Sequence, residues 1–134
     1  DLADDALAKL ELTPTAEKVR RLMHYGQMLQ SHALHFFHLC SPDLLFGFDS
    51  EVSKRNIVGV AEKHPETARR GVLIRKFGQE AIRITAGKRI HGTGSIPGGV
   101  NKSLSVEERD YLLKDAYQIV GWCRDAVHLA RELH

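Results

Sequence analysis

Residues 22–42 read LMHYGQMLQSHALHFFHLCSP and contain no Lys, Arg, Asp or Glu. At 100° per residue, the apolar side chains of this region form one helical stripe, and histidines occupy the opposite face. The stripe comprises Val19, Leu22, Met23, Gly26, Leu29, Ala33, Phe36 and Phe37, and the histidine face carries His24, His32, His35 and His38. A solvated helix face nearly always uses charged side chains, so we predict a long helix with both faces buried, the second in a polar interior.

The histidines of this face admit three interpretations. They can be structural residues satisfied by their neighbours, or members of a hydrogen-bonded network that carries protons or supports a nearby site. The third interpretation is direct metal ligation, although His32, His35 and His38 spread over a wide arc at i, i+3 and i+6. We expect no carboxylate or cysteine beside them to complete a set of metal ligands.

The remaining pattern predicts a mainly α fold, a bundle of long helices. Thr13 and Pro14 form an N-cap followed by proline at the first helical position, and Ser41-Pro42 ends the long helix. A capping box at residues 105–108 opens a final helix, which we expect to run to the end of the chain. Further elements are expected at residues 2–11 (helix), 43–50 (tight turns), 52–63 (helix) and 65–86 (helix, with Gly87 as its C-cap).

The final helix carries two apolar lines. Its predicted core stripe contains Leu112, Leu113, Ala116, Ile119, Val120, Cys123, Val127 and Ala130. Tyr111, Trp122 and Leu129 form a smaller line on another face, which in a fragment of a larger protein would contact missing structure. Cys123 is interpreted as a small core residue rather than a nucleophile, and so is Cys40 on the apolar side of the long helix.

Residues 87–103 interrupt the helices with five glycines and one proline, and we predict a small β-hairpin or an irregular glycine-rich loop there. The hairpin would pair residues 89–91 with residues 99–100. The segment is not a P-loop, because Asn101 replaces a required glycine, and Pro97 interrupts any dinucleotide-binding fingerprint. Its glycines permit close approach of the backbone to a ligand, but a purely structural turn fits equally well. The polar side chains beside it belong to Lys88, Arg89 and His91.

Composition places few limits on function. The 134 residues are 43% hydrophobic and 27% charged, and the formal net charge of +2 gives no argument for a nucleic-acid or membrane partner. No apolar run is long enough to span a membrane, and the two cysteines form no Cys-x-x-Cys pair and no disulfide framework, so we expect a cytoplasmic protein. Asp1 and His134 both fall inside helical patterns, from which we expect a fragment of a longer chain.

The strongest argument for nucleic-acid binding is the basic segment of residues 69–89, where Glu80 is the only acidic residue. Aromatic platforms are nearly absent from it, with Phe77 alone, and the charges spread around the expected helix. We therefore favour a solvated face or a contact with another protein chain and expect no nucleic-acid partner.

Four segments carry a resemblance to a known family. Residues 31–45 read SHALHFFHLCSPDLL and residues 87–101 read GKRIHGTGSIPGGVN, while residues 55–60 and 75–79 read RNIVGV and RKFGQ. The first resembles the histidine-rich helix of the large (catalytic) subunit of nickel–iron hydrogenases, and the second resembles a loop near that family's active site. The other two are similar to its cytoplasmic, NAD-reducing branch. The resemblance runs in order along nearly the whole chain.

The resemblance implies part of an oxidoreductase that catalyses the reversible oxidation of dihydrogen coupled to NAD reduction. In this family, two Cys-x-x-Cys pairs hold nickel, and two of these cysteines also bridge to an iron that carries carbon monoxide and cyanide. This sequence contains neither pair. The resemblance therefore implies one internal helical segment over residues 1–134, with residues 87–103 as a loop insertion, that binds no metal and is inactive alone.

The resemblance also implies how the parent protein is organised. One Cys-x-x-Cys pair would be encoded just before Asp1 and the other far beyond His134. The partners would be a small iron–sulfur subunit together with flavin-containing diaphorase subunits, which carry Fe-S clusters and FMN. We expect the fragment to self-associate through its histidine and tryptophan faces.

The resemblance assigns three residues of the first segment to the surroundings of the metals. Asp43 matches an aspartate over the open side of the metals, where it would orient an arginine or relay a proton. His35 and His38 match buried histidines suited to orienting ligands and passing protons.

On the glycine-rich loop, His91 matches the family's loop histidine. Lys88 and Arg89 are expected beside the site, where they would fix Asp43 or the surroundings of the metals. An alternative from another functional class remains open, namely a stand-alone helical module that binds haem or a metal through its histidines.

Overall fold

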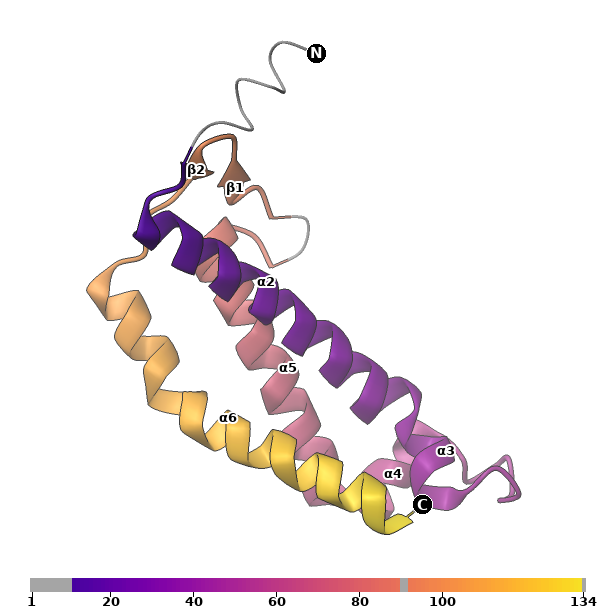
Figure 1. Ribbon diagram of the computed structural model, residues 1–134. Coiled ribbons are helices and arrows are strands. Elements are labelled where there is room, and N and C mark those ends of the chain that lie inside the picture. The colour runs from indigo at the N-terminus through magenta and orange to yellow at the C-terminus, as the bar shows by residue number, and fades with distance from the viewer. Residues whose placement is uncertain (1–10, 90–91, 134) are drawn as a thin grey trace, which may run out of the picture.

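The computed structural model describes residues 11–89 and 92–133. Its α-helices are α2 (Pro14–Leu34), α3 (Ser41–Phe46), α4 (Ile57–Lys63), α5 (Pro65–Ala86) and α6 (Val106–Leu133). Two strands, β1 (Ser95–Ile96) and β2 (Gly99–Val100), pair antiparallel before α6 (Figure 1). The predicted mainly α fold with a small hairpin is confirmed, while the helix expected at residues 2–11 lies outside the described residues.

Helices α2 and α5 run antiparallel in direct contact at the centre of the fold (Figure 1). Glycines make this approach close. A Cβ on Gly78 would lie 2.8 Å from the backbone nitrogen of Gln30, and a Cβ on Gly26 would lie 3.4 Å from the carbonyl oxygen of Gly78. Nearer the other end, a Cβ on Gly71 would lie 2.5 Å from Cγ of Phe37. The two backbones can therefore pack this closely only because side chains are absent at these points.

The apolar stripe predicted for the long helix faces α5 and is confirmed. Val19, Gly26, Ala33 and Phe37 are buried along this helix and the turn that continues it. Two clusters continue this core, one formed by Ala33, Phe37, Ile74 and Ile119, the other by Ala81, Ile84 and Leu112. The core therefore lies along α5, which contacts both other long helices.

Helix α6 packs on α5 and stands apart from α2 (Figure 1). The predicted core stripe of α6 is therefore wrong in extent, because among its members only Leu112 and Ile119 are buried. Val120 and Val127 are 50% and 60% exposed. They lie on the side of α6 that faces α2 across an open groove, so no described element covers them.

The predicted caps are confirmed. The Thr13 hydroxyl accepts a hydrogen bond from the Ala16 amide at 3.2 Å, and Gly87 ends α5 in a left-handed conformation with φ 76°. In the capping box, the Glu108 amide donates to the Ser105 hydroxyl at 3.1 Å, and the Ser105 amide donates to the Glu108 carboxylate at 3.0 Å. Both bonds satisfy amides that the first turn of α6 would otherwise leave free.

The predicted end of the long helix is wrong. Helix α2 passes at His35 into a π-helical turn, η1 (His35–Leu39), in which the Cys40 amide donates to the His35 carbonyl at 2.8 Å. Pro42 then falls in the first turn of α3, where a missing N–H is tolerated, instead of ending a helix. The extra residue in the π turn lets the chain continue past the proline. The tight turns expected at residues 43–50 are consequently confined to its second half.

Two further boundaries differ from the prediction. Helix α4 begins at Ile57 rather than near residue 52, because the Asn56 side chain caps it by accepting from the Gly59 amide at 3.0 Å. The partner of β2 is Ser95–Ile96 and not residues 89–91, of which two lie outside the described residues. Gly98, with φ 82°, allows a tight turn directly after Pro97, and this turn sets the register.

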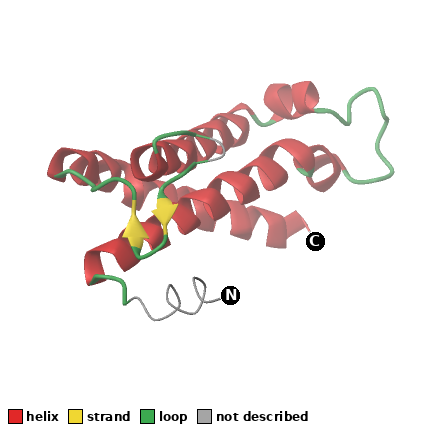
Figure 2. Cartoon of the chain, turned by 90° about the horizontal axis from the view of Figure 1, so that it is seen from above, coloured by secondary structure: helices red, strands yellow, loops and turns green. Residues whose placement is uncertain are grey.

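The hairpin and the α3–α4 connection lie at opposite ends of α2 (Figure 2). Arg20 donates to the Ile96 carbonyl at 3.1 Å and thereby fixes the hairpin beside the first half of α2. Among the described helices, none has the length and apolarity that a membrane crossing requires.

The α2–α5 contact predicts opposite outcomes for two glycine-to-alanine substitutions. Gly78→Ala places a methyl group against the backbone of α2, and overpacking of this kind lowers the free energy of unfolding by about 1–2 kcal/mol after the gain in helix propensity. Gly121→Ala in α6 meets no atom within 4 Å, so it should raise that free energy by about 0.5–1 kcal/mol. Urea denaturation followed by circular dichroism measures both. Equal effects at the two positions would contradict the close contact.

Candidate functional site

The predicted site residues fall into two polar groups at opposite ends of α2. The first group lies on η1, α3 and the connection that precedes α4. The second lies around the C-terminal end of α5 and the glycine-rich loop (Figure 1). Each group is held by hydrogen bonds between side chains from different parts of the chain.

In the first group, Asp43 pairs with Arg55. Asp43 lies in the first turn of α3, and its Oδ1 is 3.3 Å from Nε of Arg55. The Arg55 side chain is only 24% exposed, whereas the Asp43 side chain is 42% exposed. Arg55 also donates to the Phe48 carbonyl, so one guanidinium joins α3 to the connection before α4. The carboxylate is thus oriented from one side and open on the other.

A thiol lies beside one of the predicted histidines. Cys40 Sγ is 3.2 Å from Nε2 of His35. The expectation that no cysteine accompanies the histidines is therefore wrong. In an α-helix residues five apart point about 140° away from each other, but the wider π turn brings them to the same side.

His38 lies on the same turn with a different environment. Its ring is half-buried, and Nδ1 is buried with no hydrogen-bond partner among the described residues. A buried polar atom left unpaired costs about 1–3 kcal/mol. This nitrogen is therefore available to a donor or acceptor that the described chain does not supply.

The prediction that the histidine face is buried is wrong for this chain. His24, His32 and His35 are exposed, and the bond of His32 Nδ1 is to the Met28 carbonyl of its own helix, at 2.7 Å. The physical reason is that α5 covers the apolar side of α2, and no described element covers the opposite side.

In the second group, Glu80 is the central residue. It is 7% exposed, and its two carboxylate oxygens accept from Arg83 at 2.8 Å and from Arg89 at 2.7 Å. The Arg83 guanidinium, more than that of Arg89, holds the pKa of this carboxyl below its usual value of 4.5. Much of the charge in the basic segment is thus neutralised within the chain.

The glycine-rich loop is joined to α5 and α6 near this group. Lys102 donates to the Ile84 carbonyl at 3.0 Å and to the Glu108 carboxylate at 2.6 Å. The Lys102 ammonium is the main reason that the pKa of Glu108 lies below its ordinary range. Lys88 and Arg89 are exposed, and His91 lies outside the described residues.

The structure does not bring the two groups of predicted site residues together. Asp43 lies beyond the C-terminal end of α2, whereas Lys88 and Arg89 come after α5 and lie beside the N-terminal half of α2 (Figure 2). The 21 residues of α2 correspond to roughly 30 Å of helix. The partner of Asp43 is Arg55, so within this chain neither Lys88 nor Arg89 fixes that carboxylate.

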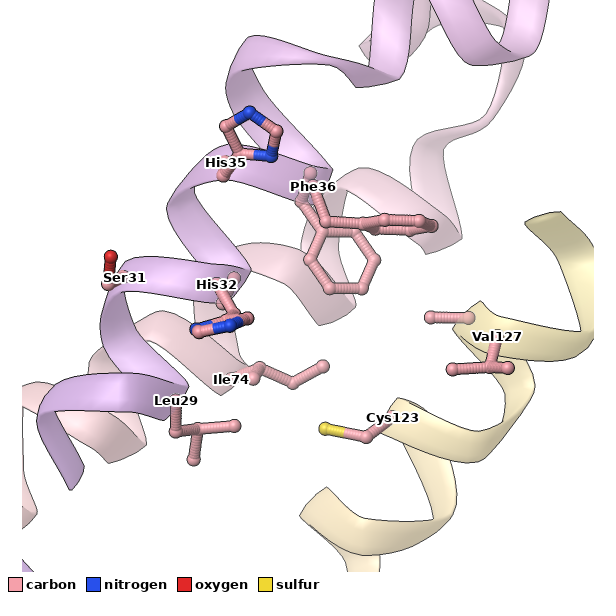
Figure 3. Close-up of a pocket in the computed structure, with 11 residues that line it drawn as sticks. Leu29, Ser31, His32, His35, Phe36, Ile74, Cys123 and Val127 are labelled. Carbon is pink, nitrogen blue, oxygen red and sulfur yellow. The ribbon is translucent and has the colours of Figure 1, made fainter. Parts of the chain in front are cut away.

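An apolar groove opens between α2 and α6, with α5 as its floor. One section, of about 480 Å³, is lined by Leu29, Phe36, Ile74, Cys123 and Val127 among others, with His32 and His35 on its rim (Figure 3). A second section, of about 430 Å³, continues past Phe77 and Val120. Within residues 11–89 and 92–133, no cluster of three His, Cys, Asp or Glu side chains could hold a metal ion.

Known proteins share most of this chain. It is 44% identical over 131 residues to the NAD-reducing hydrogenase HoxS subunit beta of Cupriavidus necator, covering 93% of this chain and 27% of that protein. It is 46% identical over 132 residues to a component of the F420-non-reducing hydrogenase vhu of Methanocaldococcus jannaschii, covering 98% and 32%. The crystal structure of an NAD+-reducing NiFe hydrogenase in the H2-reduced state superposes with a TM-score of 0.89 and 57% identity, over 96% of this chain and 29% of that one. The chain is homologous to a portion of the nickel–iron hydrogenase large subunit.

The resemblance found in the sequence is thereby confirmed. This portion spans about 30% of the length of the hydrogenase large subunits that it matches. No family model matches it.

Sequence reasoning missed three residues of the hydrogenase large-subunit portion that the structure places in the polar groups. Arg55 lies in one of the family segments, but no local pattern pairs it with Asp43. Cys40 falls on the apolar side of an α-helical wheel, because such a wheel misplaces residues beyond the π turn. Glu80 could have been found, since a single acid among many bases is typical of an internal ion pair.

The pairing of Glu80 predicts a pH-dependent contribution to stability. Its pKa is lowered in the folded chain, so the carboxylate stabilises the fold above pH 4.5, and this contribution is lost as pH falls through the folded-state pKa. Glu80→Gln should therefore lower the free energy of unfolding at pH 7 by about 1 kcal/mol, a value reduced by the exposure of both arginines. Thermal denaturation from pH 7 to pH 3 tests this.

The matched control is Glu66→Gln, which removes an exposed carboxylate near Arg69 and Arg70. It should change stability by less than about 0.5 kcal/mol across the same pH range. A difference between the wild type and Glu80→Gln that stays constant down to pH 3 would argue against the ion-pair explanation.

Proposed function

We propose that this chain is part of the catalytic subunit of a cytoplasmic, NAD-reducing nickel–iron hydrogenase. The whole enzyme would oxidise dihydrogen reversibly to two protons and two electrons and would transfer the electrons to NAD+. The observation that carries this proposal is the 57% identity and TM-score of 0.89 to an NAD+-reducing NiFe hydrogenase over 96% of the chain. Its partners would be a small iron–sulfur subunit together with diaphorase subunits that hold FMN.

The residues of this chain do not fit the first ligand set of the metals. The family's four cysteines occur as two Cys-x-x-Cys pairs, whereas this chain has only the separate Cys40 and Cys123. We therefore assign nickel, iron, carbon monoxide and cyanide to the rest of the parent protein. The role proposed for this portion is to position groups and to hold or transfer protons around that centre, and it would be inactive alone.

Asp43 is proposed to hold a proton at the open side of its carboxylate. The pairing with Arg55 supports this, because it fixes the plane of the carboxylate while leaving about two fifths of the side chain exposed. A carboxylate held from one side can accept a proton from a group outside this chain without losing its position.

His35 and His38 are proposed to pass protons or to orient groups near the metals. His38 has a buried Nδ1 without a partner among the described residues, and His35 contacts the Cys40 thiol. An imidazole is suited to this role because it titrates near neutral pH.

The loop residues are proposed to border the same enzyme at a second place. Arg89 is held by Glu80, and Lys88 projects into solvent beside it. With His91, they would meet the surroundings of the metals or a cofactor-bearing partner at the other end of α2. This part of the proposal rests on the family resemblance of residues 87–101.

Asp43→Asn in the whole enzyme tests the proton-holding role. It keeps the size of the side chain and an oxygen that can accept from Arg55, but it removes the titratable group. We expect hydrogen-dependent NAD reduction to fall by at least about 100-fold, with metal content unchanged. Asp49→Asn, in the exposed connection after α3, is the matched control and should retain full activity. Activity of Asp43→Asn near that of the wild type, with an unchanged pH profile, would exclude the role.

One contact favours a second candidate function, a stand-alone haem- or metal-binding module. The 3.2 Å distance from His35 Nε2 to Cys40 Sγ joins two donor types that bind zinc, nickel or haem iron. Under the hydrogenase proposal, titration of this chain with haem, Zn2+ or Ni2+ should give no tight stoichiometric complex. A 1:1 complex abolished by His35→Ala or His38→Ala, but not by His128→Ala, would favour the module instead.

A further inference from the structure

The groove between α2 and α6 has the composition of a protein interior and the exposure of a surface. Its two sections share Leu29, Cys123 and Val127, so they form one continuous trough above α5 (Figure 3). The floor is made by Ile74, Phe77 and Ile119, which belong to the core or pack against it.

The wall formed by α6 is unusually apolar for a face in contact with water. Leu113, Val120 and Val127 are each at least half exposed, and they recur at helical spacing along one side of the 28-residue helix. An amphipathic helix keeps such a stripe only when another element covers it. The opposite wall belongs to the portion of α2 that lacks Lys, Arg, Asp and Glu.

The rim of the groove carries one sign of charge. Arg124, His128, His32 and His35 line its edges, and no carboxylate is among its described lining residues. An occupant with an apolar face and acidic or neutral flanks fits this arrangement, whereas a basic occupant does not. Interhelical troughs lined in this way accept a helix through residues at i, i+3, i+4 and i+7.

We propose that this groove is the seat of an apolar helix, flanked by acidic or neutral residues, from the remaining part of the same large-subunit polypeptide. The inference rests on the proposed function, since the matched hydrogenase subunits are about three times as long as this chain. The remaining two thirds of such a polypeptide must bury its own apolar surface against this portion or elsewhere. The α2–α6 groove offers a preformed site for it.

Photo-crosslinking in the whole enzyme tests the proposal. The photoreactive amino acid p-benzoylphenylalanine replaces Val120 or Val127 in the groove, and it replaces Tyr117, which is 87% exposed and outside the groove, as the control. After irradiation, the crosslinked peptides are identified by mass spectrometry. We expect both groove positions to capture one apolar segment of the same polypeptide outside residues 1–134, and the Tyr117 position not to capture that segment.

Cys123 provides a readout without any substitution, because it lines both sections of the groove. In the native enzyme, N-ethylmaleimide should modify this thiol at least about tenfold more slowly than in the enzyme unfolded in urea, since only opening of the covering segment would expose it. Peptide mapping distinguishes Cys123 from other cysteines.

Three results would overturn the proposal. They are crosslinks from the groove to a different subunit, crosslinks to a second copy of the same subunit, and rapid labelling of Cys123 with no crosslink at all. These outcomes are independent of the proposed activity. An enzyme with a filled groove but no hydrogen-dependent NAD reduction would refute the function alone, and an active enzyme with an open groove would refute the inference alone.

Discussion

The contact of α2 with α5 through Gly26, Gly71 and Gly78 determines where every other described element lies. Because the two helices are antiparallel, the segment after α2 meets the segment before α5. This brings Asp43 on α3 to Arg55 before α4. At the other end, the same contact brings the glycine-rich loop after α5 to the first half of α2, where Arg20 binds its hairpin.

The features that could be predicted from the sequence are those set by local chemistry. Thr13, Gly87 and the capping box each fix a helix end through bonds within a few residues, so their positions were predictable. The π turn at His35–Leu39 was not, because its effect depends on how Pro42 is accommodated three residues beyond it. Likewise, the exposure of α6 depends on where α2 lies, and helical periodicity does not contain that information.

The candidate site was predictable in its residue types but not in its pairings. The charge-free stretch pointed to His35 and His38, and the family resemblance supported these residues and added Asp43. Their partners come from outside any local window. Arg55 is twelve residues from Asp43, and Cys40 reaches His35 only because a π turn replaces an α turn. A helical wheel therefore identified the face but misplaced the thiol that completes it.

The surface of α2 contains two kinds of unmet requirement, and both point in the same direction. In its first half, Arg21 pairs with Glu17 at 2.6 Å, as expected for a solvated face. From Leu22 onward such charges stop, yet His32 and His35 are exposed and Nδ1 of His38 is buried without a partner among the described residues. Water would be better served by charges, and a closed interior would pair the imidazole. A surface that satisfies neither condition is suited to contact with more protein, as expected for a portion spanning about 30% of the subunits it matches.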